Sequence, residues 1–415
     1  MHSATGAALG FRHLRLPVIA EPLRHRDFRL LWAGQTLSVF GSWMRIVAVP
    51  FQILALGGSV AEIGIAAAAA TAVQVPFLLF GGAIVDRVPR RLVLLISDLL
   101  SGIAMSVIAL LGITGQLRIE HLYVMAALLG LADAFFGPAL MAIVPELVPQ
   151  EILVRGNALR GLSRQVGRLG GSLVGGVLVA TFGAPVAFTV DALTYFASFI
   201  ALAVMRPGDA PAGQRKPLLA EVREGFAFVF SIPWIWATIA LFSVINLLVF
   251  GPLNVGLPVL VRDVLRADAA VFGALTGALA VGEMVAGIIL GQATIRRSGI
   301  VMYSFAVMAG VILATFGTFP MFAWLLIASF LMGITFVWFN ILWESALQRH
   351  VPRALLGRVT SVDYFGSLLL GPVAPLVAAA LIERFGTTQV FIGAGVAVAM
   401  LAASAYFVRS IRELA

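Results

Sequence analysis

The sequence contains no cysteine, and only one of its 415 residues is a lysine, Lys216. The absence of cysteine excludes disulfides, thiol catalysis and cysteine-ligated metals. The five histidines lie at the ends of apolar segments or between them, so no histidine cluster is available for a metal or a proton relay. No phosphate-binding Gly-x-x-x-x-Gly-Lys-Ser/Thr loop occurs, which excludes ATP-driven pumping by this chain alone. We therefore expect neither a metal nor a cofactor.

Charged residues are also scarce. They make up 12% of the chain, whereas hydrophobic residues make up 60%, and the mean hydropathy is +1.02. Soluble domains contain roughly 25% charged residues, so this chain is expected to lie in a lipid bilayer. The net charge of +8 would suggest a nucleic-acid partner in a soluble protein. Here the arginines fall in short loops without an aromatic-interleaved basic face, so we expect no nucleic-acid partner.

Twelve apolar runs are long enough to cross a bilayer, which requires about 20 residues per helix. They predict spans at residues 29–56, 61–85, 91–112, 121–145, 157–181, 186–205, 234–261, 270–294, 300–318, 321–346, 361–382 and 389–409. A polar linker, 206–233, separates the sixth span from the seventh. Its second part, from Leu218 to Phe226, is amphipathic and is expected to lie along the membrane surface.

The predicted fold class is therefore an all-α membrane protein with twelve transmembrane helices in two pseudo-symmetric six-helix bundles. The bundles are expected at residues 29–205 and 234–409, with an N-terminal segment at 1–28 and a tail at 410–415. An internal repeat supports two parallel halves. It consists of Val148-Pro149 and Arg155 after the fourth span, and of Val351-Pro352 and Arg358 after the tenth.

The distribution of basic residues predicts an orientation. Lysine and arginine gather on the side that holds both termini and the linker. This count places four arginines after the fourth span on that side: Arg155, Arg160, Arg164 and Arg168. The opposite side holds only Arg118, Arg262, Arg266 and Arg384. Because cytoplasmic loops are enriched in basic residues, both termini are expected in the cytoplasm. Arg45 is the one basic residue assigned to a membrane interior.

A charged turn joins the second and third spans, with the sequence Gly82-Ala83-Ile84-Val85-Asp86-Arg87-Val88-Pro89-Arg90-Arg91. Its spacing resembles motif A of the major facilitator superfamily. The resemblance implies a conformational latch formed by Gly82, Asp86, Arg87, Arg90 and Arg91. Asp86 would pair with a neighbouring arginine and face the start of the eleventh span when the cytoplasmic side is closed. A simple positive-inside anchor is the alternative, since cytoplasmic loops often carry arginines.

The resemblance extends over nearly the whole chain, from about residue 21 to residue 409. The fifth span carries Gly167, Gly171, Gly175 and Gly176 in a pattern similar to motif C of exporters that work as antiporters, with Ser172 in place of proline. These glycines would let another backbone approach closely, and plain helix packing is the alternative role. Two further segments resemble the branch of macrolide-efflux and enterobactin-exporter proteins: Asp27-Phe28-Arg29-Leu30-Leu31-Trp32-Ala33-Gly34-Gln35 and Gly41-Ser42-Trp43.

This resemblance implies a secondary active transporter of the bacterial inner membrane, and not an enzyme. It would export hydrophobic or amphiphilic small molecules by alternating access in exchange for protons, and we expect a monomer. The alternatives are an exporter of a siderophore or lysolipid, and a membrane receptor that does not transport. A siderophore would favour a cavity with several basic groups, and Arg45 is the only one expected there.

Four ionisable residues lie in predicted spans that the resemblance places at or beside the cavity: Arg45, Asp133, Glu283 and Glu344. A charge at the bilayer centre costs from about 2.5 to more than 10 kcal/mol, so each needs a partner, water or neutralisation. Asp133 and Glu283 are mid-span acids, and we predict that one of them couples transport to protons. An interhelical hydrogen bond or ion pair is the alternative. Arg45 could neutralise one of these acids or attract an anionic substrate, and Glu344 could serve a gate. Asp98 and Asp191 are expected to be structural.

The tenth span carries a face of large side chains at helical spacing: Phe336, Phe339, Asn340, Trp343 and Leu347. Flat side chains interrupted by one amide suit a bulky amphiphilic ligand, on which Trp343 and Phe339 could stack. Packing against lipid is the alternative. Further candidates for the cavity wall are Gln52, Phe135, Phe136, Asn246 and Asn254.

Overall fold

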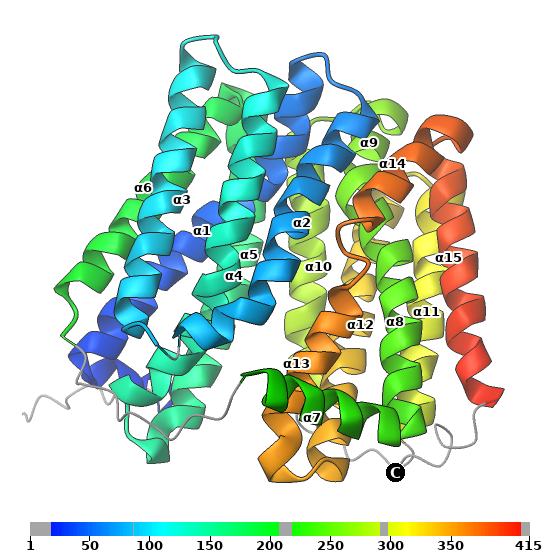
Figure 1. Cartoon of the computed structure of the whole chain (residues 1–415). Coiled ribbons are helices and arrows are strands. Elements are labelled where there is room, and N and C mark those ends of the chain that lie inside the picture. The colour runs from blue at the N-terminus through cyan, green and yellow to red at the C-terminus, as the bar shows by residue number, and fades with distance from the viewer. Residues whose placement is uncertain (1–17, 86, 207–217, 291–297, 408–415) are drawn as a thin grey trace, which may run out of the picture.

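The structure is a computed structural model that describes residues 18–85, 87–206, 218–290 and 298–407. The fold is that of an all-α membrane protein (Figure 1). Ten helices in the described ranges are long and apolar enough to cross a membrane. Two further spans complete the predicted twelve. One is a continuous helix whose sequence contains four arginines, and the other consists of two shorter helices.

The first six spans begin and end within a few residues of their predicted limits. They are α1 (Arg26–Ala55), α2 (Val60–Val85), α3 (Arg90–Ile113), α4 (Ile119–Leu147), α5 (Leu153–Phe182) and α6 (Ala184–Val204). Two short 3-10 helices flank them, η1 (Val18–Arg24) before α1 and η2 (Gln150–Ile152) before α5. Gly183, with a φ of 83°, makes the tight turn between α5 and α6, because glycine adopts this left-handed backbone without steric cost.

The last six spans are less regular. They are α8 (Pro233–Gly251), continued by η3 (Pro252–Gly256), α9 (Leu257–Val259) and η4 (Leu260–Val264); α10 (Ala269–Leu290); α11 (Ser298–Thr318); α12 (Phe322–His350); α13 (Arg353–Leu368) with α14 (Ala374–Phe385); and α15 (Thr387–Ser404) with η5 (Ala405–Phe407). Proline lacks a backbone N–H and clashes with the preceding turn. Pro252 and Pro258 accordingly accompany the wider π-helical turns that follow α8, and Gly371-Pro372 lies in the break between α13 and α14.

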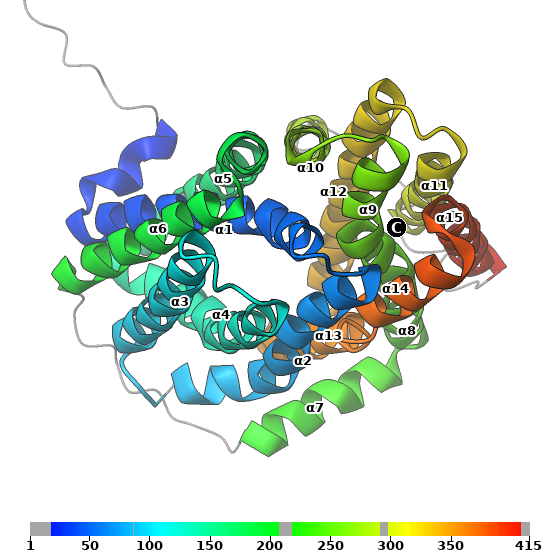
Figure 2. The same cartoon turned by 90° about the horizontal axis from the view of Figure 1, so that it is seen from above.

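The predicted amphipathic segment of the linker is the helix α7 (Leu218–Ser231). It lies near one end of the molecule, along the outer side of α13 and α8 (Figures 1 and 2). Its contact with α13 is close, because a Cβ atom on Gly225 would come within 3.0 Å of the carbonyl oxygen of Arg358. Arg358 also donates to Glu224 at 2.6 Å. We call this end of the molecule the linker end and the opposite end the far end.

The two groups of six spans stand side by side and contact each other near the far end (Figures 1 and 2). There α5 packs on α10, and α2 packs on α14. The ring of Phe51 in the first half lies 5.9 Å from that of Phe272 in the second. The backbone amide of Ala61 donates to Glu383 at 3.1 Å. The hydrophobic cores of the two halves are thus continuous at the far end.

Candidate functional site

Two polar cavities lie inside the bundle. The larger has a volume of about 660 Å³ and is lined mostly by α8, α10, α11, α12 and α13, with Met141 and Arg168 contributed by the first half. Along α12 its wall runs from Thr335 to Gln348, which is from the middle of the membrane-spanning region to the linker end. The contacts of α5 with α10 and of α2 with α14 lie on the other side. The larger cavity therefore lies between the halves, on the linker-end side of their seal.

The wall that α12 contributes is aromatic. All five residues of the predicted face line the larger cavity: Phe336, Phe339, Asn340, Trp343 and Leu347. Phe339 stacks on Phe242 of α8, with ring centroids 3.7 Å apart. Trp343 is only 6% exposed, and its Nε1 donates to Asp363 of α13 at 2.9 Å. Phe339 and Phe336 therefore offer more surface to the cavity than Trp343 does, while Trp343 holds an acid of the wall in place.

Of the remaining candidates, three line one of the polar cavities and three do not. Asn246 lines the larger cavity and donates to the carbonyl oxygen of Ser367 at 3.1 Å, and Glu344 lines the same cavity as an exposed side chain. Phe136 lines the smaller cavity. The other three candidates do not line either polar cavity: Gln52, Phe135 and Asn254. Phe135 instead packs edge-on against Phe77, because it lies on the side of α4 that faces α2.

The smaller cavity, of about 420 Å³, lies within the first half and adjoins the larger one at Met141. It is built from α1, α3, α4, α5 and α6, and its wall is rich in polar groups. The charged side chains that line it are Arg45, Asp98, Asp133, Arg160 and Arg164. Asp133 is exposed to this space in the middle of α4, and the described residues provide it with no ion-pair partner.

Arg45 is paired, but with neither of the two predicted coupling acids. Its Nε donates to Oδ2 of Asp191 on α6 at 3.1 Å, and Asp191 is 0% exposed. Gly41 makes room for this pair, because a Cβ atom there would come within 2.6 Å of the Asp191 carboxylate. Asp191 thus serves as the counter-ion of a partly buried arginine, while its second oxygen, Oδ1, has no hydrogen-bond partner among the described groups.

Glu283 on α10 joins the two halves of the molecule. Both of its carboxylate oxygens accept from Nη1 of Arg168 on α5 at 2.6 Å, and one accepts from Gln165 at 3.2 Å. The guanidinium of Arg168 also lies 4.6 Å from the ring centroid of Trp43, a cation–π arrangement. The pair therefore connects α5 to α10 beside the larger cavity, and its formation depends on how the halves are placed.

The arginines of α5 require a correction to the sequence-based count. The count places Arg160, Arg164 and Arg168 with the loop after the fourth span, although the predicted span 157–181 contains them. In the structure they lie within α5, which begins at Leu153, and their side chains line the two cavities. Arg45 is thus not the only basic group of the interior. The signal was present in the sequence, because three arginines at a spacing of four residues share one face of a helix.

The charged turn between α2 and α3 is described in part. Asp86 lies outside the described residues, so its role as a latch stays a prediction, and Gly82 lies in the last turn of α2. Arg90 forms an ion pair with Glu146 of α4. Arg91 donates to the carbonyl oxygen of Leu202 on α6 at 2.8 Å, and Arg87 is exposed. Arg90 and Arg91 therefore tie the start of α3 to its neighbours within the first half.

The glycines of α5 lie at two helix contacts. Gly167, Gly171 and Gly175 face α1, where a Cβ atom on Gly175 would come within 2.7 Å of the Cα atom of Met44. Gly176 faces the other half, and a Cβ atom there would come within 2.6 Å of the carbonyl oxygen of Ala269 on α10. One helix thus uses small residues both to pack inside its own half and to approach the second half closely.

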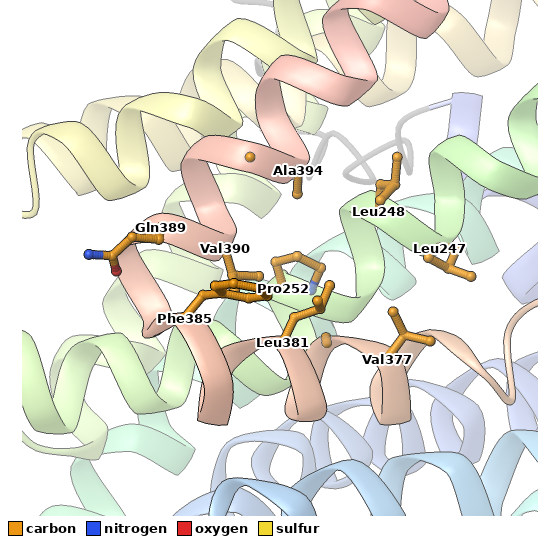
Figure 3. Close-up of a pocket in the computed structure, with 11 residues that line it drawn as sticks. Leu247, Leu248, Pro252, Val377, Leu381, Phe385, Gln389, Val390 and Ala394 are labelled. Atoms are coloured by element: carbon orange, nitrogen blue, oxygen red, sulfur yellow. The ribbon is translucent and has the colours of Figure 1, made fainter.

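A third pocket, of about 400 Å³, lies between α8, α14 and α15 (Figure 3). Figure 3 shows Pro252, Leu381 and Phe385 pointing toward one another, while the side chain of Gln389 points away from them. The lining is almost entirely aliphatic or aromatic and includes no charged residue. A pocket without directional polar groups cannot fix the orientation of a ligand, so we place the functional site in the two polar cavities.

Comparisons with known proteins agree with this architecture. The chain is 27% identical over 399 residues to the multidrug efflux pump Tap of Mycolicibacterium fortuitum, covering 93% of this chain and 96% of the relative. It is 27% identical over 378 residues to the enterobactin exporter EntS of Citrobacter koseri, covering 87% of this chain and 89% of the relative.

Solved structures of transporters share the fold. A POT family transporter superposes with a TM-score of 0.73 at 15% identity, covering 93% of this chain and 96% of that one. The nucleoside transporter NupG superposes with a TM-score of 0.68 at 14% identity, covering 94% and 98%. At these identities the likeness concerns the fold alone.

The family itself is settled by the sequence. The Major Facilitator Superfamily matches residues 31–375, which is most of the chain, and this agrees with the resemblance carried by its motifs. The protein is therefore a multi-pass membrane transporter of small molecules and not an enzyme. The chain belongs to the major facilitator superfamily.

Proposed function

We propose that this transporter exports amphiphilic compounds from the cytoplasm across the bacterial inner membrane, by alternating access and in exchange for protons. The observation that carries the proposal is the larger cavity, which lies between the halves, has an aromatic wall and is sealed toward the far end. The basic residues favour a cytoplasmic linker end. In that orientation the cavity faces the cytoplasm, which is where an exporter must load.

The wall of the larger cavity supports an amphiphilic substrate. Phe339, Phe336 and Phe242 provide apolar surface, and the amides of Asn246 and Asn340 together with a few charged groups provide polar contacts. Such a mixture suits a molecule with a large apolar body and a small polar part. Two relatives are named a multidrug efflux pump and an enterobactin exporter, which supports export without identifying the substrate.

The proposed cycle requires two changes at opposite ends of the molecule. The contact between Gly176 and α10 and the contact between α2 and α14 must open at the far end, while the halves close at the linker end. Substrate bound between the halves is then released outside. The Arg168–Glu283 pair lies at the boundary and would break or reform with the movement.

The test is transport in everted membrane vesicles that contain the full chain, with a pH-sensitive dye reporting the proton gradient. We expect amphiphilic compounds to discharge part of the gradient in these vesicles, and to accumulate inside them only while the gradient is maintained. Vesicles that accumulate such compounds without any need for a pH gradient would overturn proton exchange. Vesicles without accumulation of any compound in a broad amphiphile panel would contradict export.

A second candidate, an exporter of an anionic siderophore or lysolipid, is favoured by the arginines of α5. Arg160 and Arg164 line the smaller cavity and form no ion pair within the described part of the chain. An acidic group that enters the smaller cavity would meet both guanidiniums. The Arg164→Gln variant should then impair the transport of acidic amphiphiles several-fold and leave neutral analogues unaffected. Equal effects on both classes would contradict an anionic substrate.

A further inference from the structure

Asp98 on α3 forms part of the wall of the smaller cavity, yet it is almost completely enclosed. It is 1% exposed, and its Oδ2 has no hydrogen-bond partner among the described groups. The hydroxyl of Ser198 on α6 accepts from Nε2 of Gln35 at 3.0 Å, and its own O–H is left to donate to the carboxyl group of Asp98. Asp98 is thus a buried acid with an incomplete set of partners, on a surface that faces a cavity.

The charged and titratable groups on the packed elements leave Asp98 without a counter-ion. Arg45 of α1 is held by Asp191 of α6. Tyr195 of α6 shares a hydrogen bond with Ser42 at 3.1 Å. The charge that acts on Asp98 most directly is the carboxylate of Asp133 on α4, which has the same sign. Two arginines of α5, Arg160 and Arg164, line the same cavity. Neither forms an ion pair with Asp98 in the described part of the chain.

These surroundings favour a neutral acid. A buried carboxylate without a cation is far more costly than the protonated form, and a second carboxylate nearby adds repulsion. A metal ion is not the natural alternative, because the described residues contain no group of three acids or histidines that could hold one. The ligand that the site can take is a proton.

We propose that Asp98 is a proton-binding site of this transporter, loaded and unloaded through Asp133, the acid that is exposed to the cavity. On unloading, the O–H bond of the Asp98 carboxylic acid breaks, the carboxylate of Asp133 accepts the proton, and water in the cavity receives it. Loading follows the reverse order. The site deepens the proton exchange proposed above, on which its role in transport rests, whereas its occupancy by a proton can be measured independently.

Infrared spectroscopy of the purified full chain in lipid nanodiscs tests occupancy. At neutral pH the spectrum should contain a carbonyl band of a protonated carboxylic acid, and part of this band should disappear in the Asp98→Asn variant. The matched control is Asp268→Asn, which replaces an exposed acid at the start of α10 and should leave the band intact. An unchanged band in Asp98→Asn would show that Asp98 is ionised and would overturn the proposal.

A second variant keeps the test decisive if Asp98→Asn does not fold. Asp98→Glu retains the acid but moves its carbonyl group by one methylene, so the same band should shift in frequency. A spectrum identical to that of the unmodified chain would again overturn the proposal.

Spin labels test whether the proton at Asp98 is linked to conformation. Because the chain has no cysteine, labels can be attached at Val154→Cys and Arg349→Cys, exposed positions at the linker end of the two halves. The distance between these labels should change with pH in the otherwise unmodified chain and become pH-independent with Asp98→Asn. The same pH response in both proteins would overturn linkage through Asp98. No pH response in either would contradict the proposed proton exchange, and the infrared result would still decide whether Asp98 holds a proton.

Discussion

Phe339 and Trp343 lie one helical turn apart on α12, but their neighbours give them different roles. Phe339 stacks on Phe242 and lines the larger cavity, whereas Trp343 is buried against Trp234 and donates to Asp363. A substrate that stacks on this wall therefore gains more contact area from Phe339. The sequence pattern alone treats the two positions as equivalent, because it records spacing and not burial.

We predict that Phe339→Ala weakens the binding of flat aromatic substrates several-fold, since one aromatic contact contributes about 1 kcal/mol beyond its buried area. Binding would be followed as quenching of tryptophan fluorescence in the purified protein. The matched control is Phe182→Ala, which removes an exposed ring at the far end and should leave affinity unchanged. Equal affinities for both variants would exclude the α12 wall from the substrate site.

Trp343→Ala should act mainly on stability. Truncating a buried tryptophan typically costs about 3–5 kcal/mol, and here it also removes the donor that satisfies Asp363. The thermal unfolding midpoint in detergent should fall well below that of Phe339→Ala. A midpoint like that of the unmodified chain would show that Trp343 is not a packing residue. The prediction that its ring stacks on the substrate would then stand.

The Arg168–Glu283 pair is the residue-scale connection between the halves. Removing one partner of a pair that is largely buried leaves an uncompensated charge. We predict that Arg168→Gln and Glu283→Gln each lower the population of the described state, and that the double variant costs less than the two single costs added together. Spin-label distances across the far end would measure these populations. Strictly additive effects would show that the two residues do not act as a pair.

At the scale of one element, the two halves of α5 along its length have different roles. Its linker-end half carries arginines toward the cavities, and its far-end half carries glycines toward α1 and α10. The four arginines lower its hydropathy, so it does not qualify as a membrane span by composition. The helix can nevertheless cross the bilayer, because its charged face lines a polar cavity and not lipid.

We predict that Gly176→Leu holds the far end open. A side chain at this position would collide with the backbone of α10, so the state in which α5 and α10 are in contact becomes unfavourable. Labels at the far end should move apart, and transport should be lost although the protein folds. Gly161→Leu on the same helix is the matched control, because no atom lies within 4 Å of the position of its added Cβ. A normal far-end distance in Gly176→Leu would remove this glycine from the seal.

At the scale of the whole molecule, the direction of transport depends on which end faces the cytoplasm. Val154 lies near the linker end and is 78% exposed, while Phe182 lies at the far end and is 70% exposed. In intact cells, a membrane-impermeant maleimide should label Phe182→Cys and leave Val154→Cys unlabelled until the membrane is opened. The chain offers no competing thiol, so each signal reports one position. The opposite pattern would reverse the proposed orientation and, with it, the proposal that the cavity loads from the cytoplasm.

Hydropathy and turn residues are local properties, and they were sufficient to predict the spans and the linker helix α7, while short motifs carried the resemblance to the family. Each apolar run must be buried in lipid or protein wherever the rest of the chain lies, so its length and limits can be predicted from its own residues. The same holds for the face of α12, since helical spacing decides which side chains share a side.

Partners that are distant in sequence were decided only by the tertiary structure. Arg45 meets Asp191, Arg168 meets Glu283, and Asp98 remains without a cation, although all five residues are equally plain as charges in a membrane protein. The energy of a charge depends on the groups within a few ångströms of it and on its access to water. Those quantities arise when helices of different parts of the chain pack together, so the sequence by itself determined which charges lie in the membrane, and the packing of the helices decided what each of them can do.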